Sequence, residues 1–206
     1  MNEDLIIEET RSYVRSRLEG EGSGHDWWHI VRVYNNALDI AKNESNVNIF
    51  IVKLGALLHD IADHKFGYSD IDRKDIISNL LNKYELPKEY LDQIIYICNN
   101  ISFKSGTNNH IIKSIEGKII QDADRLDAIG AIGIGRAFAY GGYVKREMYN
   151  PDLKATNTYT IAHFYEKLFL LKDMMNTETG KRKAKIRYKT MEEYLDMFYK
   201  EWDGEV

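Results

Sequence analysis

The chain has 206 residues, of which 44% are hydrophobic and 29% are charged, and its formal net charge is -4. This composition is that of a water-soluble globular protein, and the acidic balance argues against a general nucleic-acid binder, which would normally carry a basic excess. The single cysteine, Cys98, excludes an intrachain disulfide framework and a cysteine-rich zinc site, and it fits a reducing compartment.

The first residues, Met-Asn-Glu-Asp-Leu-Ile-Ile, are acidic where a signal peptide would be basic. A first helix is predicted over residues 3–19, and the glycine-rich segment 20–24 closes it. No stretch of the chain approaches the roughly 20 apolar residues that a membrane-spanning helix needs. We therefore expect a cytoplasmic protein without membrane contact, acting as a monomer or a homodimer.

Helical periodicity dominates the rest of the chain, which holds only two prolines. A second helix is predicted over 26–43, because its apolar residues recur at i, i+3 and i+4. A third, over 47–63, is apolar nearly all round, which is typical of a buried central helix. The later helices are expected at 70–84, 88–101, 114–126 with a continuation over 127–140, 158–175 and 180–202. A loop rich in Gly, Lys and Tyr is expected at 141–157.

The sequence shows no alternating strand pattern, no internal repeat and no linker that would divide it. We therefore predict an all-α fold in which residues 1–206 form one domain.

Four metal-binding side chains are spread over three of the predicted helices. The third helix ends in His59 and Asp60, residue types that are costly to bury unless they are paired or bound to a metal. His29 lies in the first turn of the second helix, and Asp124 lies near the end of the helix over 114–126. Two imidazoles and two carboxylates form a mixed nitrogen and oxygen set that suits manganese, iron or magnesium. Four protein ligands would leave two octahedral positions open, as a catalytic site requires.

This His…His-Asp…Asp pattern resembles that of the HD-domain superfamily of metal-dependent phosphohydrolases. The flanking motifs are similar to those of the short, single-domain bacterial members and span about residues 24–180. They are His-Asp-Trp-Trp-His-Ile, His-Asp-Ile-Ala-Asp-His-Lys-Phe, Asp-Ala-Asp-Arg-Leu-Asp-Ala-Ile-Gly and Met-Asn-Thr-Glu-Thr-Gly. The resemblance implies a helical bundle of the HD-domain type, on which the C-terminal helix 180–202 packs.

The same resemblance implies one bound divalent ion, with Mn²⁺ favoured and Mg²⁺, Fe²⁺, Ni²⁺ and Zn²⁺ as alternatives. It implies attack of a metal-activated water on a phosphate ester or anhydride, with a nucleotide as the expected small-molecule partner. The subgroup suggests cleavage of a nucleoside triphosphate to monophosphate and pyrophosphate. Other HD hydrolases cut nucleoside monophosphates, cyclic nucleotides or guanosine alarmones, and the sequence does not choose among these substrates.

Asp63 is the candidate catalytic residue. It follows His59 by four residues and Asp60 by three, which would place it on their helical face. The resemblance puts an active-site acidic residue here, where it would orient or deprotonate the attacking water. The alternative is an ordinary polar residue at a helix end.

Substrate-binding candidates are the cations that would offset phosphate charge, together with one histidine expected at the pocket edge. They are Lys65, Lys104, Arg136, Lys167 and His25. Arg125 is a weaker candidate because it follows Asp124 directly and helical neighbours do not share a face.

Two other functions remain open. His25 and His29 imitate the paired histidines of zinc peptidases, with Asp26 in place of the usual glutamate. A non-catalytic nucleotide-binding or sensor protein of the same fold is the second alternative, although such a protein has no need to keep four metal ligands. Should Asp124 prove not to be a ligand, Asp122 and Asp127 are the nearest substitutes.

Overall fold

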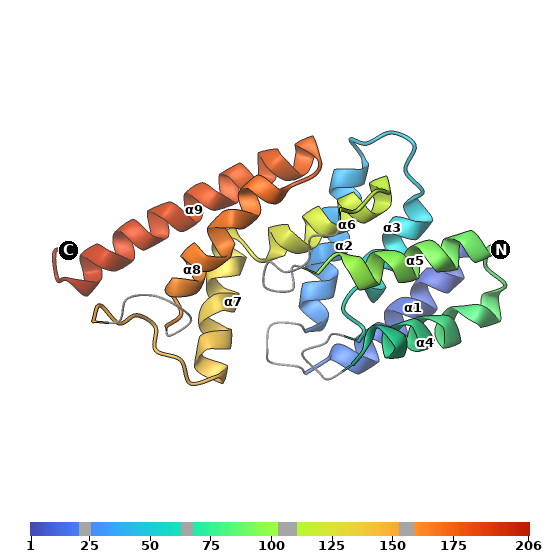
Figure 1. Cartoon of the computed structure of the whole chain (residues 1–206), viewed down its shortest axis with the longest axis horizontal. Coiled ribbons are helices and arrows are strands. Elements are labelled where there is room, and N and C mark those ends of the chain that lie inside the picture. Colours follow the sequence, from blue (N-terminus) through green and yellow to red (C-terminus); the bar gives the residue numbers. More distant parts are fainter. Residues whose placement is uncertain (21–25, 63–67, 103–110, 153–158) are drawn as a thin grey trace. The chain divides into compact units, whose positions relative to one another are not determined.

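The computed structural model describes residues 1–20, 26–62, 68–102, 111–152 and 159–206. These residues form two compact units, Met1–Ala123 and Asp124–Val206. Both are helical (Figure 1), and within the described ranges the only strand-like pairing is an isolated bridge between Glu147 and Tyr159. The predicted all-α class is confirmed, whereas the single domain stays a prediction.

The first unit contains five complete helices and most of a sixth among its described residues. They are α1 (Glu3–Leu18), α2 (Trp27–Ala41), α3 (Ile49–Leu58), α4 (Asp70–Leu81) with a short 3₁₀ turn after it (Asn82–Tyr84), α5 (Lys88–Asn100) and α6 (Ile115–Asp127), which continues into the second unit. The helices predicted at 3–19, 26–43, 88–101 and 114–126 match these bounds to within two residues.

Helix α3 is the centre of the first unit and packs against α1, α2 and α5. Its N-cap, Asn48, accepts a hydrogen bond from the backbone N–H of Ile51, and eight of its ten residues are buried. A Cβ on Gly55 would lie 2.5 Å from Cδ1 of Ile120, so this glycine lets α6 pack closely against α3. The apolar composition of α3 thus places its C-terminal end inside the unit.

Helix α6 is tied to the rest of the first unit by buried polar side chains. Glu116 accepts hydrogen bonds from the backbone N–H of Asn48 at 2.9 Å and from Nε2 of Gln93 at 2.8 Å. Gln121 donates to the carbonyl of Ile101 at 3.2 Å. These contacts fix α6 against α3 and α5 over its residues 115–123.

The second unit contains the last turn of α6 and the helices that follow it. These are α7 (Gly130–Tyr143), α8 (Ala162–Glu166), a 3₁₀ helix (Leu168–Met174) and α9 (Glu178–Trp202). Aromatic side chains from three of the helices meet in its core: the ring of Phe138 lies 6.2 Å from that of Phe164 and 6.1 Å from that of Tyr194. None of the helices in the described residues is long and apolar enough to cross a membrane.

Three predicted helices differ from the structure. The helix expected over 47–63 ends at Leu58, and residues 59–62 form turns. The helix over 114–126 does not continue through 140, because Gly130 starts a new helix with a φ of +76°, a conformation that non-glycine residues rarely adopt. The helix expected over 158–175 is instead the short α8 followed by the 3₁₀ segment; Lys167, between them, leaves helical geometry with φ -138° and ψ -56°.

Candidate metal centre

His29 enters the interior from the first turn of α2. Asp26 is the N-cap of this helix, and its Oδ1 accepts a hydrogen bond from the backbone N–H of His29 at 2.8 Å. This cap starts α2 at Trp27 and so sets the direction of the His29 side chain. The imidazole is fully buried, with 0% of the residue exposed. A buried imidazole needs a polar partner or a metal.

His59 and Asp60 follow the last residue of α3. His59 is the C-cap of the helix, and its Nδ1 lies 2.9 Å from the carbonyl oxygen of Ala56. Because a carbonyl oxygen can only accept, Nδ1 must carry the proton of this hydrogen bond. The neutral ring then has its lone pair on Nε2, which is the tautomer that binds a metal through Nε2.

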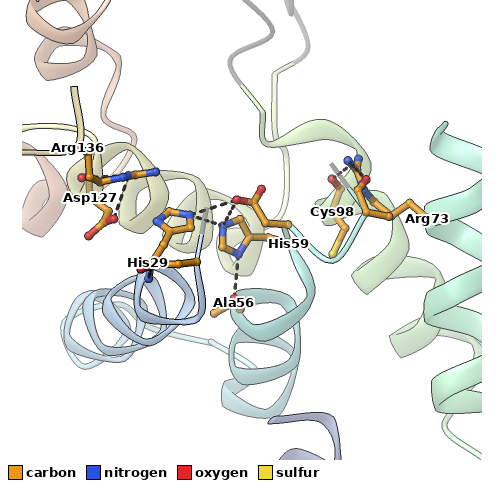
Figure 2. Close-up of polar contacts among 10 residues, drawn as sticks. His29, Ala56, His59, Arg73, Cys98, Asp127 and Arg136 are labelled. Atoms are coloured by element: carbon orange, nitrogen blue, oxygen red, sulfur yellow. Dashed lines mark hydrogen bonds and ion pairs between the residues drawn. The ribbon is translucent and has the colours of Figure 1, made fainter. Parts of the chain in front are cut away.

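Two polar atoms of the first unit lie close to Nε2 of His59. Nε2 of His29 lies 3.2 Å from Nε2 of His59, and Figure 2 shows the two imidazoles pointing toward one another. Oδ2 of Asp60 lies 3.3 Å from Nε2 of His29 and 3.7 Å from Nε2 of His59.

These separations fit a shared divalent ion. Ligand atoms bound at about 2.1 Å lie about 3.0 Å apart at the right angles of an octahedron and about 3.4 Å apart in a tetrahedron. The donor set of two imidazoles and a carboxylate suits such an ion as well. The residues therefore fit a metal in both spacing and chemistry.

Asp124 lies on α6, one residue beyond Ala123 in the same continuous helix. Ligand atoms of His29, His59 and Asp124 all lie within 4.8 Å of one another. Of the two alternative carboxylates, Asp127 is paired with an arginine. Asp127 is buried and accepts a hydrogen bond from Nη1 of Arg136 at 2.9 Å, while Asp122 is buried with 0% exposed. The grouping thus favours Asp124 among the three aspartates of α6.

The other predicted site residues are not brought together by the described part of the chain. His25, Asp63, Lys65 and Lys104 lie outside the described residues. Helix α3 ends at Leu58 and Asp63 lies beyond the described residues, so its expected place on one helical face with His59 and Asp60 stays a prediction. The roles of these four side chains stay predictions.

Arg136 and Lys167 lie in the second unit. Arg136 binds both the carboxylate and the carbonyl of Asp127, at 2.9 and 3.2 Å, as Figure 2 shows for the carboxylate. Lys167 is half-buried between α8 and the 3₁₀ helix. Arg125 donates to the carbonyl of Met174, so its guanidinium holds the backbone of its own unit. The substrate-binding roles of Arg136 and Lys167 stay predictions.

Several known proteins are similar to this chain over most of its length. A model of the HD domain family matches residues 27–129. YpgQ of Bacillus subtilis (strain 168) is 40% identical in an alignment that covers 99% of this chain and 97% of YpgQ. A crystal structure of an HD-superfamily hydrolase from Bacillus thuringiensis is 39% identical, with a TM-score of 0.81 over 98% of this chain and 99% of the other. The crystal structure of YpgQ in complex with ADP is 38% identical, with a TM-score of 0.77 over 95% and 97%.

Proposed function

Because this chain belongs to the HD domain family, we propose that it is a metal-dependent phosphohydrolase that cleaves a phosphate ester or anhydride of a nucleotide. The observation that carries the proposal is the convergence of Nε2 of His29, Nε2 of His59 and Oδ2 of Asp60 at separations of 3.2 to 3.7 Å. Two buried imidazoles beside a largely covered carboxylate are costly without a metal or a hydrogen-bond network that satisfies all three.

The ion would be held by His29, His59, Asp60 and Asp124, and Mn²⁺ is the species we favour among divalent metals with mixed nitrogen and oxygen ligands. When bound, it supplies an activated water and polarises a phosphoryl oxygen. The protein side chains orient the groups that would bind the ion. The bond from Nδ1 of His59 to the carbonyl of Ala56 keeps Nε2 directed inward, and it holds the ring in one orientation.

Proton transfer and charge stabilisation are assigned to residues beyond the ligands. Asp63 is proposed to orient the attacking water and to accept its proton. Lys65, Lys104, Arg136 and Lys167 are proposed to offset the phosphate charge, and His25 to lie at the pocket edge. For Arg136, the bonds to Asp127 would fix the guanidinium in one direction, which lowers the entropic cost of binding an anion.

The substrate is proposed to be a nucleotide because a relative that shares 38% of its residues was crystallised in complex with ADP. Cleavage of a nucleoside triphosphate to monophosphate and pyrophosphate is the specific reaction we favour. Nucleoside diphosphates and monophosphates are the alternatives within the same chemistry.

A panel assay tests this proposal. The purified chain is loaded with Mn²⁺ and incubated with nucleoside tri-, di- and monophosphates and cyclic nucleotides, while bound metal is measured on the same preparation. We expect release of phosphate or pyrophosphate from at least one nucleotide, and loss of both activity and metal in His59→Ala. His163→Ala is the matched control, since this histidine of α8 is assigned no role in metal or substrate binding. Tight nucleotide binding without any hydrolysis would instead support a sensor protein.

The zinc-peptidase alternative requires two histidines on one helical face. Helix α2 begins at Trp27 after its N-cap Asp26, so position 25 precedes the helix that carries His29. We therefore expect His25→Ala to keep its metal and to lose activity only moderately. Loss of metal in His25→Ala together with retention in His59→Ala would reverse the assignment in favour of a peptidase.

A further inference from the structure

Arg73 is the largest fully buried side chain among the described residues, with 2% of the residue exposed. It comes from the first turn of α4, and its guanidinium reaches across to two other segments of the first unit. Nε and Nη2 both donate to the carbonyl of Ala62, at 2.9 and 2.6 Å. Nη1 donates to the carbonyl of Cys98 at 3.0 Å, and Figure 2 shows Arg73 beside Cys98.

This buried cation is compensated mainly by backbone carbonyls. Oδ1 of Asp70 is 3.6 Å from Nη1, but the Asp70 side chain is half-exposed, so water screens that pair. Cys98 lies in the last turn of α5, where unpaired carbonyls concentrate partial negative charge. Three short bonds to two carbonyls therefore replace the carboxylate partner that a buried arginine usually has.

Ala62 is the last described residue of the turn that carries His59 and Asp60. The turn starts with a hydrogen bond from the backbone N–H of Ile61 to the carbonyl of Leu58 at 3.1 Å. The carbonyl of Ala62, in a residue that is 0% exposed, accepts both of these bonds from Arg73. The two bonds from Arg73 thus fix the turn 59–62 at Ala62, while helix α3 fixes it at His59.

We infer that Arg73 is a positioning residue of the metal centre. By holding the Ala62 carbonyl, it fixes the turn that aims His59 and Asp60 at His29. A ligand displaced by about 1 Å loses its bond to the ion, so the turn has to be held from both ends. This inference rests on the proposed metal-dependent function, and its test measures metal binding rather than hydrolysis.

The test compares Arg73→Met with Ile77→Ala. Ile77 lies one turn further along α4 and is also fully buried, but it makes no polar contact with the turn after α3. Both variants lose packing of α4, whereas only Arg73→Met removes the bonds to Ala62. Mn²⁺ affinity is measured by titration on each variant at a temperature where circular dichroism shows it to be folded.

We expect Arg73→Met to bind Mn²⁺ about 10–100-fold more weakly than the parent, which is the range seen when an outer partner of a metal ligand is removed. Ile77→Ala should stay within about threefold of the parent at a comparable loss of thermal stability. Equal affinities for Arg73→Met and the parent would overturn the inference, because the arginine would then serve stability alone.

A second variant covers the case in which Arg73→Met does not fold. Arg73→Lys keeps the charge but cannot make the two-atom fork to Ala62. We expect it to fold and to bind Mn²⁺ several-fold more weakly than the parent, and parent-like affinity in this variant would also overturn the inference. A parent chain that binds Mn²⁺ but hydrolyses nothing would refute the proposed function while leaving the role of Arg73 intact. A parent chain that binds no Mn²⁺ would refute both.

Discussion

Nε2 of His29, in the first turn of α2, lies 3.2 Å from Nε2 of His59, the C-cap of α3. The hydrogen bond from Nδ1 of His59 to Ala56 leaves a lone pair on the facing nitrogen of the neutral ring. This arrangement fits the proposed role of the pair as two ligands of one ion. The variants below test what this arrangement predicts for metal content, rate and stability.

The carboxylate of Asp124 is predicted to be the fourth ligand. Asp124→Ala should lose most of its bound metal while it remains a folded helical protein, because α6 is held by Glu116 and Gln121 elsewhere. Metal analysis after gel filtration, with circular dichroism on the same sample, measures both quantities.

The matched control for Asp124→Ala is Asp127→Asn. Asp127 is buried and bonded to Arg136, so its replacement should cost about 1–3 kcal/mol of stability and keep the metal. Full metal occupancy in Asp124→Ala would assign the ligand to Asp122 or Asp127 instead.

Asp63 is predicted to act on the attacking water. Asp63→Asn should keep the metal and the fold but lose the ability to accept a proton. General-base groups contribute about 10²–10⁴-fold, so turnover should fall by about that factor. Substrate affinity should change little, because the interaction is made in the transition state. Turnover within about threefold of the parent, with metal retained, would remove Asp63 from the mechanism.

Gly55 is predicted to set the distance between α3 and α6. Valine at this position would drive Ile120 away from α3, which should cost about 1–3 kcal/mol and weaken metal binding. Denaturant unfolding and Mn²⁺ titration report the two effects. The double variant with Ile120→Ala should recover part of both losses. A Gly55→Val protein as stable as the parent would show that the two helices can separate without cost.

Cys98 is predicted to be unreactive in the folded chain. Burial raises the pKa of its thiol to about 12, against a partly opposing effect of the Arg73 guanidinium, and the residue is 1% exposed. Alkylation at pH 8 should therefore proceed only as fast as the first unit opens. Rapid modification of every molecule in the native state would contradict this burial.

The same pKa shift predicts a dependence of stability on pH. The folded-state pKa is raised above that of the unfolded chain, so the contribution is fully present below about pH 9 and is lost as the pH rises toward 12. Relative to Cys98→Ala, the parent should lose about 1–2 kcal/mol between pH 8 and pH 10. Urea unfolding of both proteins at the two pH values measures this difference.

Sequence periodicity was sufficient to predict the helices whose buried residues recur with a period of 3.6. It failed at 158–175 because Phe164, Leu168, Leu171 and Met175 have helical spacing and are all buried, yet the backbone changes to 3₁₀ geometry. A spacing of three, as between Leu168 and Leu171, suits either helix type. The backbone leaves helical angles at Lys167, and the segment that follows it is a 3₁₀ helix.

The candidate metal ligands could be predicted from the sequence, but the side chains that position those ligands could not. Arg73 stands among Asp70, Asp72, Lys74 and Asp75, which are all exposed, so it resembles a solvated charged run. The available signal was its spacing, because Arg73, Ile77 and Leu81 recur every four residues and form the buried stripe of α4. The carbonyls that a guanidinium reaches depend on how segments far apart in the sequence pack together. The pattern of a single sequence does not give that packing.

The three converging groups are unequally open to solvent, and this implies an order of events when the protein is loaded. The side chain of His29 is 0% exposed and that of His59 1%, whereas that of Asp60 is 13% exposed. If these groups hold a cation as proposed, one that arrives from water would meet the Asp60 carboxylate first, and the imidazoles would replace part of its remaining hydration afterwards. Removal of the ion by a chelator would follow the opposite order. Its rate should then be set by dissociation of the ion from the two histidines, and it should not increase with the concentration of a chelator in excess.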